Sequence, residues 1–273
     1  MGSPLVSICI PTYECEKTII ESIKSALNQT YKNIEIIIVD NCSSDKTYDL
    51  LKTVNDPRIK LYRNNNNLGM CENWNECLKY AKGDYIQYLH GDDILFPYCI
   101  EKKVSLAIKD TSIVLVFSST EIINSNNKTL MIRRYKNKDL VQDGESLVYK
   151  SLYTRNIFGE PSNVLFKRSV LEQTEAFCNK LKYSTDWEFW LRIAHYGKVG
   201  YIADALTKYR VSDSNTTSSL MIKEILNDDT IMIEQLKKFG KYKLPFYKIF
   251  IHKFIIWFRT YARIIYIKLS SNK

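Results

Sequence analysis

The segment IEIIIVD, residues 34–40, decides how the first part of this chain folds. Its apolar run from Ile34 to Val39 is almost continuous, and it ends at a carboxylate, Asp40. A strand with one face in water would alternate apolar and polar residues, so this run predicts a strand that is covered on both faces. Such a strand is typical of a parallel sheet with helices packed on its two sides.

Strand and helix patterns alternate on either side of this segment. Short apolar strands are expected at residues 6–10, 59–62, 85–89 and 113–117, and amphipathic helices at 19–27, 50–54, 74–81 and 97–108. This repeated order predicts an α/β fold with a mostly parallel central sheet flanked by helices. Ligands of such sheets bind at the carboxyl ends of the strands.

Two adjacent carboxylates, Asp92 and Asp93, follow one of these strands in YLHGDDILFP, residues 88–97. Neighbouring like charges are costly unless something neutralises them, and hard oxygen ligands on a loop suit Mg²⁺ or Mn²⁺. The alternative is a turn in which an Asp caps the next helix. Asp40 also has two interpretations: it accepts hydrogen bonds from a base or ribose, or it is an ordinary turn residue after a strand.

The sequence contains no glycine-rich phosphate loop. Neither GxGxxG nor GxxxxGK[ST] occurs. Dinucleotide-binding and P-loop folds are therefore disfavoured, and a metal ion is left to hold any diphosphate.

A second acidic candidate, Asp186, lies in YSTDWEFWLRIAHYG, residues 183–197. Trp187, Trp190 and the apolar residues after them recur at helical spacing, which puts Asp186 in the first turn of a helix. The helix dipole alone favours an acid there. As a catalytic base, Asp186 would have to face the same pocket as Asp92. The two tryptophans are interpreted either as core residues or as a platform for a sugar.

Positive charge is concentrated at the C-terminus. The net charge is +9, and residues 235–273 hold ten of the 39 basic residues and no acidic one, which leaves 29 basic and 30 acidic residues before them. A helix after Pro245 would align Lys248, His252, Arg259 and Arg263 in a narrow basic stripe on a wide apolar surface. This pattern predicts attachment of residues 244–273 to a membrane surface, or packing on the same domain or on a second subunit of a homodimer. So apolar a helix offers few contacts to nucleic acid.

The cysteines and the first residues indicate a reducing compartment. The seven cysteines include no CxxC pair, and residues 1–11 lack the features of a signal peptide. No apolar stretch approaches the roughly 18 residues that a membrane span needs. We therefore expect a cytoplasmic protein at the inner face of the cell membrane.

Four segments together resemble the inverting glycosyltransferase family 2, which has the GT-A fold. They are VSICIPTYE at 6–14, IEIIIVDNCSSDKT at 34–47, NNLGMCENWNECLKYAKGDYIQYLHGDD at 66–93 and YSTDWEFWLRIAHYG at 183–197. Their order and spacing fit over about the first 215 residues. The resemblance implies a nucleotide-sugar-binding half at residues 1–118, an acceptor-binding half at 119–215, and a basic, aromatic-rich helical tail at 216–273.

The resemblance also assigns roles to particular residues. Those expected to bind the donor nucleotide or its sugar are Pro11, Thr12, Tyr13, Glu14, Asp40, Asn67, Asp92 and Asp93. Asp92 matches the last Asp of the family's metal-binding DxD motif, Asp93 supports the metal shell or the donor sugar, and Asp186 matches the catalytic base. Two positions depart from the family: His90 replaces the first Asp of DxD, and Ser212 replaces a His that many relatives carry.

The implied activity is a metal-dependent, single in-line displacement. A sugar would move from a nucleotide-sugar, taken as a UDP-sugar, to a hydroxyl of a glycan or lipid-linked saccharide, with Mn²⁺ or Mg²⁺ at the diphosphate. Such transfers build surface polysaccharides and glycoconjugates. One alternative is a nucleotidyltransferase, which would need more basic residues near the first loop than Lys17. The other is a non-catalytic membrane-docking or assembly module.

Overall fold

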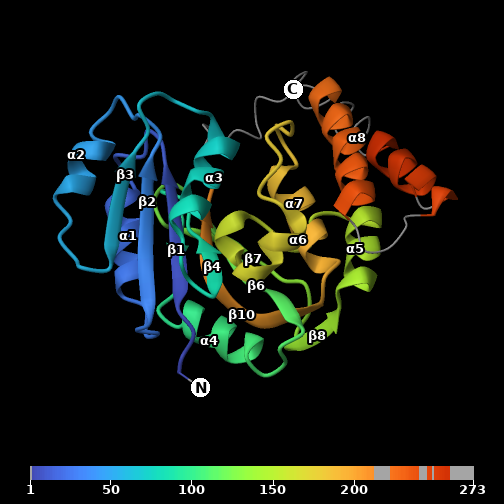
Figure 1. Cartoon of the computed structure of the whole chain (residues 1–273), viewed down its shortest axis with the longest axis horizontal. Helices are drawn as coiled ribbons and strands as arrows, with labels where there is room; N and C mark the ends of the chain where they lie inside the picture. Colours follow the sequence, from blue (N-terminus) through green and yellow to red (C-terminus); the bar gives the residue numbers. More distant parts are fainter. Residues whose placement is uncertain (1, 212–221, 240–244, 248, 259–273) are drawn as a thin grey trace.

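The structure, a computed structural model, describes residues 2–211, 222–239, 245–247 and 249–258. Within these ranges one ten-stranded sheet forms the centre of the molecule (Figure 1). Its main path runs in the order β3-β2-β1-β4-β9-β6-β10-β5, with β7 paired to β6 and β8 paired to β10. The strands are β1 Val6–Thr12, β2 Ile34–Asp40, β3 Ile59–Arg63, β4 Tyr85–Tyr88, β5 Ile94–Leu95, β6 Ile113–Ile123, β7 Thr129–Arg133, β8 Leu140–Asp143, β9 Val164–Lys167 and β10 Lys198–Arg210.

The predicted parallel arrangement is confirmed for the first four strands. β3, β2, β1 and β4 are parallel neighbours, and β6 and β10 form a second parallel pair. The strand β9 separates the two groups and is antiparallel to both β4 and β6. The carboxyl ends of β1, β2, β4 and β6 therefore lie along one edge of the sheet.

Helices cover both faces, which explains why the central strands are apolar throughout. The helices are α1 Ile19–Leu27, α2 Thr47–Lys52, α3 Met70–Tyr80, α4 Cys99–Ala107, α5 Gly144–Tyr153, α6 Leu171–Thr174, α7 Thr185–Ala194 and α8 Ile222–Phe239, with short 3₁₀ turns η1 Pro161–Asn163 and η2 Arg168–Val170. Successive residues of a strand point to opposite faces. Accordingly, Ile36 and Ile38 pack in one apolar cluster with α1 and α4, while Ile37 and Val39 pack in another with α3 and α7.

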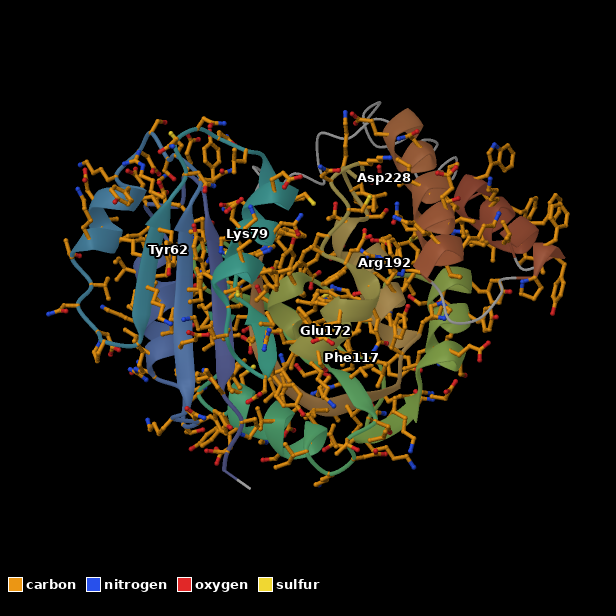
Figure 2. All side chains as sticks on the ribbon, in the orientation of Figure 1. Tyr62, Lys79, Phe117, Glu172, Arg192 and Asp228 are labelled. Atoms are coloured by element: carbon orange, nitrogen blue, oxygen red, sulfur yellow. The ribbon has the colours of Figure 1, made fainter. Side chains whose placement is uncertain are left out.

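Two of the alternatives left open by the sequence are settled by the fold. Neither Asp92 nor Asp93 caps a helix, because α4 begins at Cys99 after Tyr98 and the short strand β5 intervenes. The platform interpretation of the tryptophans is wrong, because Trp187 and Trp190 are buried in the core. Figure 2 shows how densely side chains fill the space between the sheet and α7.

The C-terminal region begins with a helix that belongs to the core. Three apolar residues of α8, Met232, Ile233 and Leu236, are buried in the cluster that contains α7. A further helical segment covers residues 246–258, of which 248 is not described. No helix in the described ranges has both the length and the apolar character to cross a membrane.

The predicted basic stripe on this last segment is wrong at His252. Its side chain is fully buried, with Nδ1 2.7 Å from the carbonyl oxygen of Leu152 and Nε2 against Asp229. The histidine side of the helix faces α5 and α8 because it finds polar partners there. The other stripe residues, Lys248, Arg259 and Arg263, lie outside the described residues, as does Ser212.

Candidate active site

Asp40 ends β2 opposite Thr12, the last residue of β1. Its carboxylate is buried and is held within its own turn: Ser43 donates its hydroxyl to Oδ1 at 2.6 Å and its backbone N–H to Oδ2 at 3.2 Å. Arg63 Nε lies 3.3 Å from Oδ2. The turn interpretation thus describes the contacts of Asp40, while its role toward a base stays a prediction.

The loop after β1 is tied to the same turn. The backbone N–H of Glu14 donates to Ser43 Oγ at 3.0 Å, and the Ser44 hydroxyl donates to Glu14 Oε1 at 2.7 Å. Glu14 has a positive φ of 48°, an uncommon conformation for a residue with a side chain. Pro11 is part of β1, and Tyr13 projects from the loop with 47% of its surface exposed. Ser43 therefore links this loop to Asp40, because it forms hydrogen bonds with both.

The asparagine-rich loop folds around Asn41, which sequence reasoning missed. The Asn41 amide donates to Asn67 Oδ1 at 2.8 Å, and its own oxygen accepts from Asn64 Nδ2 at 2.9 Å and from the N–H of Leu68 at 3.0 Å. Asn67 Oδ1 also accepts from the N–H of Gly69 at 2.8 Å. The structure thus brings Asn67 beside the turn that carries Asp40.

His90, Asp92 and Asp93 form an acidic cluster in the turn between β4 and β5. Each of the three offers a ligand atom, and these atoms lie within 4.8 Å of one another. No described side chain forms a hydrogen bond or ion pair with the Asp92 carboxylate, whereas its backbone oxygen accepts from Arg210 Nε at 2.9 Å. Asp92 is therefore the carboxylate available to a ligand.

Asp93 is buried and points into the protein. Its Oδ2 accepts from the Ser162 hydroxyl at 2.5 Å and its Oδ1 from the backbone N–H of Arg210 at 3.0 Å. Burial, and after it the charge of Asp92, raises the pKa of Asp93 well above its usual range. Its geometry suits support of the turn better than direct contact with an ion.

His90 fits a nitrogen ligand for a divalent cation. Within the described structure its Nε2 is buried and has no hydrogen-bond partner. The ring packs on Trp74 with centroids 5.2 Å apart. Burial lowers the pKa of His90, although Asp92 and Glu160 oppose this effect, so the ring keeps a lone pair. An unpaired buried nitrogen is costly unless something binds it.

A buried polar network beneath this turn was not foreseen from the sequence. Lys103 Nζ donates to Gln87 Oε1 and to the carbonyl oxygen of Asn163, both at 3.0 Å. Gln87 Nε2 in turn donates to the carbonyl oxygen of Ser162 at 2.8 Å. Burial lowers the pKa of Lys103. These residues come from β4, α4 and η1, and they hold the serine that contacts Asp93.

Asp186 lies in the first turn of α7, as predicted. Its Oδ1 accepts the backbone N–H of Trp187 at 2.6 Å, and the amide of Asn156 lies 3.5 Å from its Oδ2. Burial and, after it, the charge of Glu160 raise the pKa of Asp186, the N–H of Trp187 and the charge of Arg133 oppose them, and the resulting pKa is about 7. A carboxylate with such a pKa is suited to accept a proton near neutral pH.

Glu160 links the base candidate to the acidic cluster. It forms an ion pair with Arg133, and its charge raises the pKa of His90, of Asp93 and of Asp186. Glu160 therefore lies near all three groups, and sequence reasoning did not single it out. Its loop, residues 156–162, contacts Asp186 through Asn156 and Asp93 through Ser162.

The start of α7 is fixed from α8. Asp228, labelled in Figure 2, accepts backbone N–H groups of the residues before Asp186. Its Oδ2 accepts from Lys182 at 3.0 Å, Tyr183 at 2.5 Å and Ser184 at 2.9 Å, and its Oδ1 also accepts from Lys182 at 3.1 Å. These three residues precede the first residue of α7, Thr185, so their N–H groups lie outside the hydrogen-bond ladder of that helix. Asp228 thus fixes the residue at which α7 begins, and with it the position of Asp186.

Comparisons with known proteins define the class. Residues 1–349 of S. aureus TarS, crystallised with UDP-GlcNAc, match with a TM-score of 0.72 and 18% identity, over 88% of this chain and 68% of that one. The likeness shows the fold: an α/β protein of the GT-A type, as the sequence predicted.

The family follows from the sequence comparisons. The profile of glycosyl transferase family 2 matches residues 7–174. An uncharacterised glycosyltransferase of Rickettsia typhi is 31% identical over 93% of this chain and 78% of its own length. The Escherichia coli UDP-Glc:alpha-D-GlcNAc-diphosphoundecaprenol beta-1,3-glucosyltransferase WfaP is 29% identical over 84% and 85%. The chain belongs to glycosyl transferase family 2 and is a glycosyltransferase, which confirms the prediction over its two alternatives.

Proposed function

We propose that this protein transfers a sugar, with inversion, from a UDP-sugar to a hydroxyl of a lipid-linked saccharide during synthesis of a surface polysaccharide. The observation that supports the proposal is the loop around Glu160, which contacts the base candidate Asp186 through Asn156 and the acidic cluster through the bond from Ser162 to Asp93. Two relatives add support. The E. coli enzyme named above acts on a diphosphoundecaprenol-linked sugar, and TarS binds UDP-GlcNAc.

In this proposal the donor nucleotide lies along the ends of β1 and β2. The residues assigned to it are Pro11, Thr12, Tyr13, Glu14, Asp40 and Asn67. The exposed ring of Tyr13 is available to stack on a base, and the Asn41 network holds Asn67 in place. Asp40 would keep its Ser43 contacts, since a carboxylate oxygen has lone pairs for a further donor.

The metal ion expected in this family is assigned to Asp92 and His90, with Asp93 behind them. The fit rests on the unpaired Asp92 carboxylate and the buried, unpaired Nε2 of His90. Mg²⁺ prefers an all-oxygen shell, whereas transition ions accept imidazole. Mn²⁺ is therefore expected to support the enzyme better than Mg²⁺. When bound, the ion stabilises charge on the departing diphosphate.

Asp186 would act as the general base. The acceptor hydroxyl gives its proton to Asp186 as the oxygen attacks the anomeric carbon from the face opposite the diphosphate. The pKa of about 7 makes this carboxylate a stronger base than an exposed Asp while leaving it largely ionised at slightly alkaline pH.

The C-terminal helical segment is assigned to the membrane surface. Its described apolar side chains are largely exposed, among them Phe246 at 83%, Phe250, Phe254, Trp257 and Phe258. A row of exposed aromatic rings suits the headgroup region, and the basic residues of 244–273 suit anionic lipids. This arrangement would keep the enzyme at the cytoplasmic face, where its lipid-linked acceptor is presented.

The test is transfer itself. The purified protein with Mn²⁺ is incubated with UDP-glucose, UDP-GlcNAc or GDP-mannose and with a GlcNAc-diphosphate lipid analogue. We expect one UDP-sugar to give a disaccharide product with the β linkage that inversion of an α-linked donor requires. Neither transfer nor hydrolysis of any donor, with either Mn²⁺ or Mg²⁺, would refute the proposal.

A further inference from the structure

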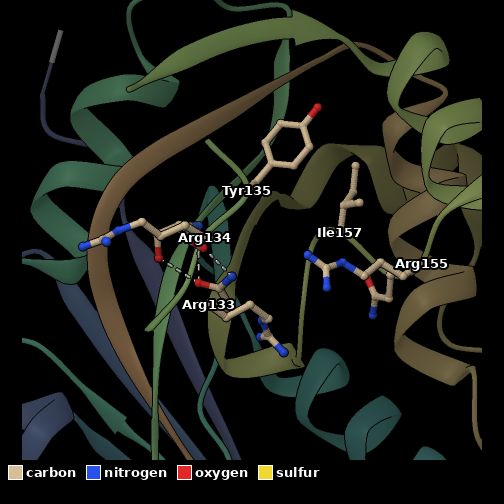
Figure 3. A pocket seen from close by; sticks show the side chains of 8 residues that line it. Arg133, Arg134, Tyr135, Arg155 and Ile157 are labelled. Atoms are coloured by element: carbon tan, nitrogen blue, oxygen red, sulfur yellow. Dashed lines mark hydrogen bonds between the residues drawn. The ribbon is translucent and has the colours of Figure 1, made fainter. Parts of the chain in front are cut away.

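A pocket rich in arginine lies beside the base candidate Asp186. It is lined by Ser118, Arg133, Arg134, Tyr135, Arg155, Asn156, Ile157 and Asn163. Figure 3 shows Arg133 and Arg155 reaching into it from opposite sides, while Arg134 points away. Its connection to the active site is direct, because the amide of Asn156 lies 3.5 Å from Asp186.

The positive charge of this pocket is only partly neutralised. Arg133 forms an ion pair with Glu160. In the described ranges the exposed Arg155 guanidinium forms neither an ion pair nor a hydrogen bond. Lys150 adds charge at the rim, where its Nζ donates to the Tyr135 hydroxyl at 2.8 Å and lies 4.6 Å from the ring centroid. The pocket therefore favours an anion.

We propose that this pocket binds a phosphate group of the acceptor, the diphosphate that joins the acceptor sugar to its lipid. The inference rests on the proposed function. An acceptor whose hydroxyl lies at Asp186 carries its diphosphate at another position of its sugar ring, and Arg155 lines the pocket that Asn156 joins to Asp186. A guanidinium makes paired hydrogen bonds to phosphate oxygens.

The donor also contains a diphosphate, so the experiment must separate the two sources. The acceptors are a GlcNAc diphosphate with a short alkyl chain and the alkyl glycoside that lacks the diphosphate. Arg155→Gln removes the charge without removing a described contact. Lys109→Gln is the matched control, because Lys109 is exposed near the amino end of β6, at the opposite edge of the sheet.

For Arg155→Gln we expect the KM of the diphosphate acceptor to rise about tenfold or more, as for loss of a charge-assisted contact. The KM values of UDP-sugar and of the alkyl glycoside should not change, and Lys109→Gln should match the wild type. An unchanged KM for the diphosphate acceptor would overturn the proposal. An equal rise in the KM of the donor would assign Arg155 to the donor diphosphate instead.

Calorimetry separates this inference from the proposed function. With EDTA and no donor, the alkyl GlcNAc diphosphate should bind the wild type and bind Arg155→Gln about tenfold more weakly. If the wild type binds the ligand more tightly than Arg155→Gln does but transfers no sugar, the proposed function is refuted and the phosphate-binding role of the pocket is supported. If the protein transfers sugar and both proteins bind the ligand equally, the pocket fails alone.

Discussion

The proposed donor side and the proposed acceptor side of the site hold their polar groups in opposite ways. On the proposed donor side, Asp40 and Asn67 form hydrogen bonds with the protein, through Ser43 and Asn41. On the acceptor side, Asp186 has one backbone donor and a raised pKa, and Arg155 has no described partner. Hydrogen bonds within the protein thus hold Asp40 and Asn67 in place without a ligand. The proposed acceptor side keeps charge that no described group neutralises, and in the proposed function Asp92 lies between the two sides.

The largest effect is expected at this boundary. Asp92→Asn should lower transfer with Mn²⁺ about 1,000-fold, because a charge that stabilises the leaving diphosphate is removed. It should also weaken Mn²⁺ binding measured by electron paramagnetic resonance. Glu172→Gln, which neutralises an exposed acid on α6, is the control and should leave both unchanged. Transfer by Asp92→Asn within tenfold of the wild type would show that the two sides do not meet there.

The pH profile should report the acceptor side alone. Asp186 must be ionised to act as a base, and its pKa is raised to about 7. The rate constant kcat should therefore rise tenfold per pH unit below about 7 and level off above it. The Kd of UDP-sugar should change little over the same range. A kcat that is flat from pH 5.5 to 7.5 would be incompatible with Asp186 as the titrating base.

Stability should titrate with the same group. A raised pKa means that the folded state holds the proton more tightly than the unfolded state does, so ionisation costs stability as pH rises from about 4 to 7. Asp186→Asn removes this cost. Its Tm should exceed that of the wild type by a few degrees at pH 8, with a gap that shrinks toward pH 4. A gap that does not depend on pH would argue against a buried, titrating carboxyl.

A smaller effect is expected from the support of α7. Asp228→Ala leaves three backbone N–H groups without their acceptor, at a cost of about 1–3 kcal/mol in the free energy of unfolding. Transfer should fall about tenfold through misplacement of Asp186, with donor binding intact. Asp228→Asn keeps an acceptor oxygen and should recover most of the activity. Equal loss in both variants would point to charge instead of position.

The smallest effect on catalysis is expected from the C-terminal segment. The double variant Phe250→Ser and Phe254→Ser should reduce sedimentation with anionic liposomes while leaving transfer to a short-chain acceptor within about twofold, since these rings are exposed and belong to none of the residues assigned to the chemistry. Ile108→Ser, at an exposed apolar residue after α4, serves as the control. Unchanged sedimentation of the double variant would leave packing on protein as the role of this surface.

The contrast between the two sides also explains what the sequence could predict. The strand at residues 34–40 can be predicted from its own residues. Alternate side chains pack in the two cores on either side of the sheet, so the run must be apolar throughout. Asp40 and Asp92 follow such strands directly, so their place at the sheet edge could be inferred from the chain alone.

The contacts that hold these residues in place could not be predicted in this way, since they join distant segments. Glu160 forms an ion pair with Arg133, 27 residues away in the sequence, and Asp93 accepts a backbone hydrogen bond from Arg210, 117 residues away. The buried His252 was misjudged because helical spacing identifies a stripe of residues but not which side of the helix packs. The 13-residue strand β10 was not predicted, because the feature that defines it is its pairing with β6, a distant segment of the chain.

The central claim, that the donor is held by one side and the proton is taken by the other, is tested most directly by Asp186→Asn. The measurement pairs the rate of sugar transfer with the Kd of the UDP-sugar in Mn²⁺. The account predicts a fall in transfer of about 100- to 10,000-fold, as for loss of a general base, with the Kd within about twofold of the wild type. Normal transfer, or a loss of donor binding as large as the loss of transfer, would contradict it.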